Sequence, residues 1–388
     1  MNKNNFLNII DFGSSKIRFA SFDINLEEKF SDSSKAYINE DFQKHFEIIK
    51  KIVKKAEKKF SHHIEDIILI LDAAELFVID LSLSKNLYKS SIINEIYDSL
   101  ILELNQIVSA HYNKYYLSQI IMDKCIVDNE KVFDELPKDK KIFNNLKVDF
   151  KLICFPKRFA KKIIDKFTKN NLNITNVFCT SYIKSQFYVK KLDKDKVSFL
   201  DIGLNRSSLV FFENKKLKFI ETIPIGGYHI TKDISKILKI SESDAEKLKK
   251  SFNKSDTEFS YKNRTLDDTM VVQEIINKNI SVNLLKEVIL YRVQEIMDLI
   301  YKKSQNNRRE YILEDSELLL IGEGSKLFNN NSFYLNDKFG FKSINFYTET
   351  DVQICKCGLK NQIINYEVPK IITKKYGIFE KFFNFFDK

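Results

Sequence analysis

One short pattern occurs twice in this chain of 388 residues, and it constrains the fold more than any other feature. In each copy an apolar strand ends in Asp-x-Gly, a few small or polar residues follow, and a second strand begins. The motif stands at Asp11-Phe12-Gly13 in the first copy and at Asp201-Ile202-Gly203 in the second. A strand pattern that is duplicated at this distance predicts two related domains that face each other.

The residues around each copy favour an α/β sheet. In the first copy, residues 17–22 alternate like a strand, residues 41–60 have apolar side chains at helical spacing, and residues 67–71 form an uninterrupted apolar run. In the second copy, strands are expected at 208–212, 217–222 and 318–321. A strand, a hairpin, a helix and a buried strand are the usual opening of an α/β domain.

Composition excludes several classes of protein. Hydrophobic residues make up 44%, which is enough for a sizeable core, and the net charge of +10 comes from Lys rather than from Arg. Nucleic-acid binders favour Arg for bidentate contacts, so no nucleic-acid partner is expected. The odd number of five cysteines and the lack of a signal peptide or a spanning apolar run favour a cytoplasmic protein.

The two Asp-x-Gly turns are the first candidates for a site. A carboxylate at a strand end, beside a Gly with bare N–H groups, can hold the water shell of Mg²⁺ next to phosphates. Taken alone, each turn is more often a plain connection between strands, but two turns that face each other could clamp a triphosphate and its metal. The candidate residues are Asp11, Gly13, Ser14, Ser15 and Lys16 in the first turn and Asp201, Gly203, Asn205, Arg206 and Ser207 in the second.

Two further segments could contact a nucleoside. Gly322-Glu323-Gly324-Ser325 follows a buried strand, and glycines let a flat base or ribose approach the backbone, although a tight strand-to-helix turn explains them equally well. Glu246 and Lys249 share one helix face at i and i+3, where the plain interpretation is a surface ion pair. No P-loop, Rossmann, nucleophile-elbow or metal-ligand spacing occurs in the sequence.

In this order, the segments resemble the ATP-binding folds of the actin, Hsp70 and sugar kinase superfamily, and most of all the FtsA family of bacterial cell division. The most specific stretch, Ile223-Pro224-Ile225-Gly226-Gly227 and on to Ile234, is similar to the family pattern I-P-x-G-G-x-x-[IV]-T-x-D-I. The resemblance implies a duplicated ribonuclease H-like (actin-like) ATPase fold, of α/β class, with inserted subdomains. The segments it implies are 1A at 1–82, 153–196 and 351–370; a 1C-like insertion at 83–152; 2A at 197–240 and 311–350; a 2B-like subdomain at 241–310; and a membrane-targeting helix at 371–388.

The resemblance also implies ligands and partners. ATP would lie between the domains, with Mg²⁺ held through water by Asp11 and Asp201. Glu246 and Lys249 would reach the ribose or adenine, and the segment from Gly322 to Ser325 would line the adenosine pocket, with Gly227 close to the nucleotide. The 2B-like subdomain would bind the C-terminal peptide of an FtsZ-like tubulin homologue, and the protein would self-associate into filaments at the division site, on the inner face of the cell membrane.

The second turn departs from the family pattern D-x-G-G-G-T-x-D. Leu204, Asn205 and Arg206 follow Gly203, and Ser208 stands where the family has its second Asp. Arg206 adds a cation that could contact phosphate directly. No side chain is an evident general base, so we expect the protein to be at most a weak ATPase and to act mainly as a nucleotide-dependent structural adaptor.

The last residues form a predicted amphipathic helix. Apolar side chains recur at spacings of three and four, too short a run to span a bilayer but suited to lie in its interface, unless the helix docks on the protein's own core. These side chains are Ile378, Phe379, Phe382, Phe383, Phe385 and Phe386.

Two alternatives share the fold. A pilus-assembly protein of the PilM kind would bind a partner's N-terminal peptide and should lack an amphipathic tail, so a docked, buried tail would favour it. A small-molecule kinase would need a catalytic Asp, and Ser208 at the position of the second Asp argues against it.

Overall fold

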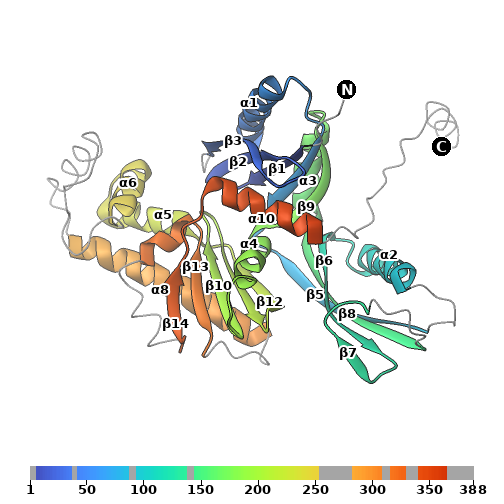
Figure 1. Cartoon of the computed structure of the whole chain (residues 1–388). Coiled ribbons are helices and arrows are strands. Elements are labelled where there is room, and N and C mark those ends of the chain that lie inside the picture. Colours follow the sequence, from blue (N-terminus) through green and yellow to red (C-terminus); the bar gives the residue numbers. More distant parts are fainter. Residues whose placement is uncertain are drawn as a thin grey trace.

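The computed structural model describes residues 6–36, 42–86, 93–137, 144–252, 282–307, 315–328 and 340–364. Three sheets organise this part of the chain (Figure 1). Two of them have five strands each and build the body of the molecule, and the third belongs to an inserted subdomain on one side of it.

The first sheet forms around the first Asp-x-Gly motif. Its strands, in spatial order, are β3 (Glu28–Lys35), β2 (Lys16–Phe22), β1 (Leu7–Phe12), β4 (Asp66–Leu71) and β9 (Asn173–Cys179). The hairpin neighbours β3, β2 and β1 are antiparallel, whereas β1, β4 and β9 are parallel. Helix α1 (Phe42–Phe60) provides the crossover to β4, and α3 (Lys157–Thr168) precedes β9.

The second sheet repeats this arrangement. Its strands, in spatial order, are β12 (Lys216–Ile223), β11 (Ser207–Glu213), β10 (Lys196–Ile202), β13 (Glu317–Ile321) and β14 (Ser343–Phe346). The directions also match, because β12, β11 and β10 are antiparallel and β10, β13 and β14 are parallel. The register places Asp11 opposite Arg18 and Asp201 opposite Ser208, seven residues on in each case. The predicted duplication is therefore present in the order, direction and register of the strands.

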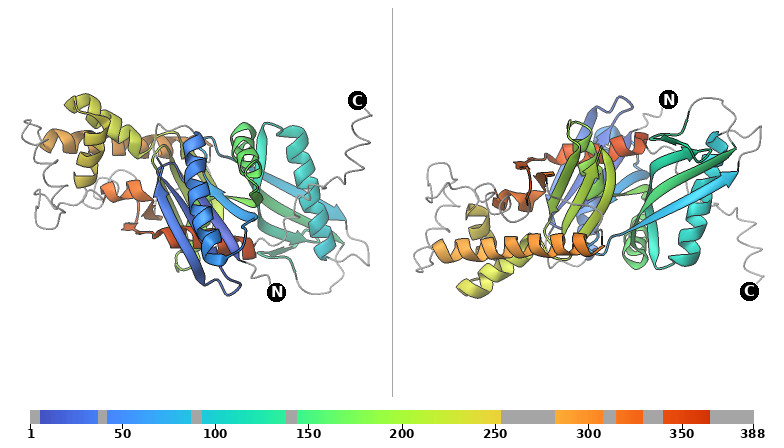
Figure 2. Two further views of the ribbon diagram at one scale, coloured as in Figure 1. Left: turned by 90° about the horizontal axis from the view of Figure 1, so that it is seen from above. Right: turned by 90° about the horizontal axis from the view of Figure 1, so that it is seen from below.

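Helices lie between the two sheets and on their outer faces. Helix α4 (Thr180–Val189) contacts strands of both sheets, and α10 (Asp351–Ile364) packs on the first sheet and on α4 (Figure 1). Helices α5 (Gly227–Leu238), α6 (Glu242–Phe252) and α8 (Val282–Asn307) belong to the second domain, where α8 lies along the sheet (Figure 2). A short 3₁₀ helix, η2 (Glu323–Phe328), follows β13.

Burial explains why the two domains hold together. One apolar core contains side chains of the first sheet together with Phe199, Phe212 and Leu319 from the second. A separate core lies on the other face of the second sheet, under α5, α6 and α8, and includes Phe211 and Phe219. Alternate residues of β11 thus point to different cores, so that the second sheet is buried on both faces, as its continuous apolar strands predict.

The inserted subdomain is richer in strands than the sequence predicts. It contains α2 (Ile93–His111) and the antiparallel strands β5 (Phe77–Asn86), β8 (Asn145–Pro156), β6 (Tyr115–Val127) and β7 (Lys131–Phe133). The sequence of β6 lacks a clean alternation of apolar and polar side chains. Its pairing with β8 shifts register at two places, which breaks the two-residue period.

Candidate functional site

The two Asp-x-Gly motifs end at the junction of the two domains. Asp11 and Asp201 are the equivalent residues of β1 and β10, and each is 3% exposed. Both carboxylates act on the buried amine of Lys184 in α4: burial lowers the pKa of Lys184, but Asp201, Glu349 and Asp11 raise it to a net value above its usual range. The duplication therefore places the two carboxylates at equivalent positions of the two sheets.

The first turn is tied to helix α10. The Nη1 of Arg18 donates to Asp11 at 2.7 Å, and its Nε donates to Asp351, the first residue of α10, also at 2.7 Å. Lys16 bonds the same Asp351 at 2.5 Å. Burial raises the pKa of Asp11, against the lowering effect of Arg18. Gly13 is required because a Cβ there would lie 2.5 Å from the carbonyl oxygen of Lys16, whereas Ser14 is exposed and Ser15 is half-buried.

The second turn sends Arg206 across the junction. Gly203 N–H donates to the Arg206 carbonyl at 2.9 Å and closes the turn. The Arg206 guanidinium pairs with Asp72, which directly follows β4 of the first sheet, and lies 3.5 Å from Asp201. Burial lowers the pKa of Arg206 to about 9, which leaves it charged at neutral pH. Asn205 is exposed, and Ser207 donates to the Ile225 carbonyl at 2.8 Å.

Lys184 completes a buried group of charges, which we call the junction cluster: Asp72, Lys184, Asp201, Arg206 and Glu349. The Lys184 amine lies 2.7 Å from Glu349 and 3.4 Å from Asp201. Within the cluster the side chains are 4–13% exposed. Burial raises the pKa of Glu349, as expected where three carboxylates share two cations.

The most specific stretch of the sequence packs directly on the second turn. Gly227 N–H donates to the Gly203 carbonyl at 3.0 Å, and Tyr228 N–H donates to the Leu204 carbonyl at 2.8 Å. A Cβ at Gly226 would lie 2.5 Å from the Gly203 carbonyl oxygen, so only glycine permits this approach. The start of α5 thus fixes the backbone of the second turn.

Glu246 and Lys249 pair with each other, as the plain interpretation predicts, but not on the surface. Lys249 is 6% exposed, and its amine lies 2.6 Å from Glu246 and 2.8 Å from the Gly227 carbonyl. Burial lowers the pKa of Lys249. The pair therefore joins α6 to the start of α5, and its contact with a ribose or adenine stays a prediction.

The glycine segment after β13 also borders the cluster. Gly322 has a φ of +85° and its N–H donates to Glu349 at 3.2 Å. Ser325 donates to the Gly322 carbonyl at 2.6 Å, and Gly324 packs against Ile202, which follows Asp201. Glu323 is exposed. The segment is thus a tight strand-to-helix turn beside the junction, and the adenosine pocket stays a prediction.

The predicted magnesium site does not fit the residues present. Asp11 already accepts from Arg18, and Asp201 lies between Lys184 and Arg206. A magnesium ion held through these two carboxylates would lie beside buried cations, which repel it in a medium of low dielectric constant. Within the described ranges, no group of three or more His, Cys, Asp or Glu side chains is arranged to hold a metal ion.

Sequence reasoning missed Asp72, Lys184 and Glu349. Two of them had a signal: Asp72 directly follows the buried strand 67–71, and Lys184 is the single charged residue of an otherwise uncharged helix, Thr180–Val189. Glu349 had none, because it lies in a polar connection before α10.

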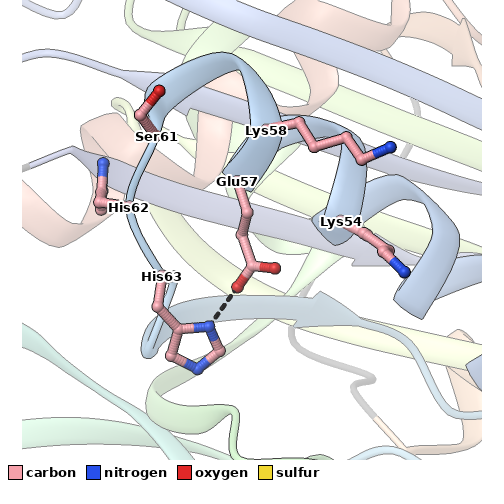
Figure 3. A pocket seen from close by; sticks show the side chains of 6 residues that line it. All are labelled: Lys54, Glu57, Lys58, Ser61, His62 and His63. Atoms are coloured by element: carbon pink, nitrogen blue, oxygen red, sulfur yellow. Dashed lines mark ion pairs between the residues drawn. The ribbon is translucent and has the colours of Figure 1, made fainter.

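A surface pocket elsewhere carries no chemistry of this kind. It lies at the end of α1, and Figure 3 shows the ion pair between His63 and Glu57 beside it. The lining residues are Lys54, Glu57, Lys58, Ser61, His62 and His63. The predicted amphipathic helix at 371–388 lies outside the described residues, and in the part that is described no helix is long and apolar enough to cross a membrane.

Comparisons with known proteins agree with the family resemblance. The family model "Cell division protein FtsA" matches residues 198–344. The FtsA of Bacillus subtilis is 26% identical over 206 residues, which is 52% of this chain and 45% of that protein. The FtsA of Streptococcus pneumoniae is 28% identical over 123 residues, which is 32% of this chain and 26% of that protein. The chain therefore spans about half or less of the length of these relatives.

A solved structure extends the likeness to the whole fold. The PilM–PilN type IV pilus biogenesis complex has a TM-score of 0.60 and 11% identity, and the match covers 92% of this chain and 98% of that one. The duplicated sheets and the match over nearly the whole chain define an actin-like fold of α/β class, as predicted. Among such proteins its sequence is similar to FtsA, and the predicted resemblance to that family is confirmed.

Proposed function

We propose that this chain is an FtsA-like cell-division adaptor. It self-associates, binds the inner face of the cytoplasmic membrane at the division site through the helix at 371–388, and carries an FtsZ-like tubulin homologue there. The observation that carries this proposal is the FtsA match over residues 198–344, which includes the second turn, the start of α5 and the helices expected to receive the tubulin homologue's C-terminal peptide.

We also propose that ATP binds between the two domains. The supporting features are the paired Asp-x-Gly turns, the Gly226–Gly227 approach to the second turn, and the glycine segment after β13, all of which border one junction. Ser14, Asn205 and Glu323 are the exposed residues of these segments and offer polar groups to a ligand from solvent. We expect ATP hydrolysis to be slow, because Asp72 and Asp201 are paired with Arg206 rather than positioned to activate water.

The alternatives receive less support. The likeness to PilM rests on 11% identity and shows the fold alone. A kinase function lacks support because this chain has Ser208 in place of the second Asp. Ser208 is fully buried in β11 and accepts a hydrogen bond from Arg206 at 2.5 Å.

Recruitment to vesicles tests the proposal. The full chain should sediment with anionic vesicles and should carry the tubulin homologue with it. The bound fraction of a chain ending at residue 375 should be smaller by roughly tenfold or more, because Phe side chains that enter the membrane interface supply the affinity. Filament formation should strengthen binding by avidity.

Neighbouring residues of the tail provide the matched control. Phe383→Ser should weaken vesicle binding, and Asn384→Ser, on the polar face of the predicted helix, should leave it unchanged. A tubulin homologue without its C-terminal peptide should stay in the supernatant. Equal sedimentation of the full and the shortened chain would remove the membrane part of the proposal, and sedimentation of the peptide-less partner would remove the partner part.

A further inference from the structure

The junction cluster joins the two domains with the chain's own cations. Arg206 comes from the turn between β10 and β11 and reaches Asp72 at the end of β4, so one ion pair connects the second sheet to the first. Lys184, from the helix between the sheets, reaches Glu349 and Asp201 on the second domain's side. The links therefore cross the junction at two places.

The cations stand where a metal would be needed. The carboxylates at the ends of β4 and β10 bring an excess of negative charge to the junction, which a divalent cation can neutralise. Here Arg206 provides that charge for Asp72 and Asp201, and its Nη1 is also fixed by Ser208 at 2.5 Å. Lys184 provides it for Asp201 and Glu349. Each amine or guanidinium lies within hydrogen-bond or ion-pair distance of two partners, so the carboxylates are satisfied without a metal.

We propose that Arg206 and Lys184 take the place of a divalent cation: they pair with the junction carboxylates, hold the two domains together, and exclude magnesium. Arg206 is the third residue after Gly203, and the hydrogen bond from the Gly203 N–H to the Arg206 carbonyl closes the turn from which its side chain reaches Asp72. The closed junction consequently requires neither magnesium nor a nucleotide. This inference is independent of the membrane and partner functions proposed above.

Charge rescue in the full chain tests this proposal. The melting temperature of the wild type should be the same in millimolar magnesium chloride and in EDTA at equal ionic strength. Arg206→Ala leaves Asp72 without a cation and leaves Asp201 with Lys184 alone, so the melting temperature of the variant should fall by several degrees. Magnesium should then restore part of that loss, and potassium at the same ionic strength should not.

Arg292→Ala is the matched control. Arg292 also pairs with two carboxylates, Asp233 at 2.5 Å and Glu295 at 2.7 Å, but all three belong to the second domain. The melting temperature of Arg292→Ala should fall by less than that of Arg206→Ala, and magnesium should not restore it. If Arg206→Ala fails to fold, calorimetric titration of magnesium chloride into the wild type decides: no binding is expected. Magnesium binding to the wild type, or a loss in Arg206→Ala that is no larger than in the control and insensitive to magnesium, would overturn the proposal.

Discussion

Lys184 is a buried cation that pairs with two carboxylates of the junction cluster. Its side chain is 4% exposed and is held by Glu349 and Asp201, and burial raises the pKa of the Glu349 carboxyl. Removing one partner of a buried ion pair is costly because the other partner stays desolvated and uncompensated. The stability of the junction therefore depends on this side chain.

Lys184→Met, which keeps the length and removes the charge, should lower the free energy of unfolding by about 3–5 kcal/mol at neutral pH. The loss should shrink as the pH falls, because Glu349, whose pKa burial raises, takes up a proton and the excess negative charge left by the substitution decreases. Urea unfolding at several pH values measures it. Lys194→Met is the control, since Lys194 pairs with Glu317 but is 47% exposed, and its loss should destabilise the protein far less than the loss of Lys184. Equal losses in the two variants would contradict this view of the junction.

Asp351 gives the molecule a pH dependence of its own. Although burial raises the pKa of this carboxyl, hydrogen bonds from Lys16, Arg18 and Ser33 lower it from 3.8 to about 2. A group whose pKa is lowered on folding stabilises the protein above its unfolded value and loses that effect as the pH falls toward the folded value. The stabilisation is therefore complete above pH 3.8 and disappears toward pH 2.

Asp351→Asn should thus destabilise the protein by about 1 kcal/mol at neutral pH, a figure reduced for the partial exposure of the side chain. The difference from the wild type should vanish near pH 2. Chemical unfolding of both proteins across this range measures it, and a difference that stays constant with pH would show that the hydrogen bonds to Asp351 are not charge-assisted.

At the scale of elements, α10 returns the chain from the second sheet to the first. It begins with a capping box, in which the Gln353 N–H donates to the Thr350 hydroxyl at 3.2 Å and the Thr350 N–H donates to Gln353 at 3.0 Å. Gly358 then lets the helix approach the first sheet. A Cβ on it would lie 2.9 Å from Cγ2 of Ile70 and 3.6 Å from Cγ2 of Ile9.

Gly358→Ala should therefore destabilise the protein, although Ala is favoured over Gly in a helix by about 1 kcal/mol. The overpacking penalty is about 1–3 kcal/mol, because Ile70 is a branched side chain in a buried strand and cannot move aside. Thermal unfolding measures the net effect. Lys356→Ala, on the same helix, should change stability little, and a gain in stability for Gly358→Ala would show that the helix does not lie this close to the sheet.

The same elements show what the sequence could predict. Strands β1, β4, β10 and β13 are short apolar runs that end in turn residues, so their positions and the duplication follow from local pattern. The sheet of the inserted subdomain does not, because its strands pair over long distances in the chain and shift register. In the junction, Asp11 and Asp201 were predictable from their turns, whereas the pairing of Arg206 with Asp72 depends on how two domains meet.

At the scale of the whole molecule, two copies of one sheet close on a junction whose positive charge comes from Arg206 and Lys184. In the proposed function ATP binds at this junction, and in the further inference magnesium does not. Nucleotide binding without magnesium would distinguish this chain from a metal-dependent nucleotide-binding protein of the same fold.

Calorimetric titration of ATP into the full chain, once with magnesium and once with EDTA, tests this account most directly. We predict binding of micromolar to sub-millimolar strength with the same dissociation constant in both buffers. Binding that appears only with magnesium would contradict the account, because a metal would then supply the charge that we assign to Arg206 and Lys184. A complete absence of binding in both buffers would instead remove ATP from the proposed function.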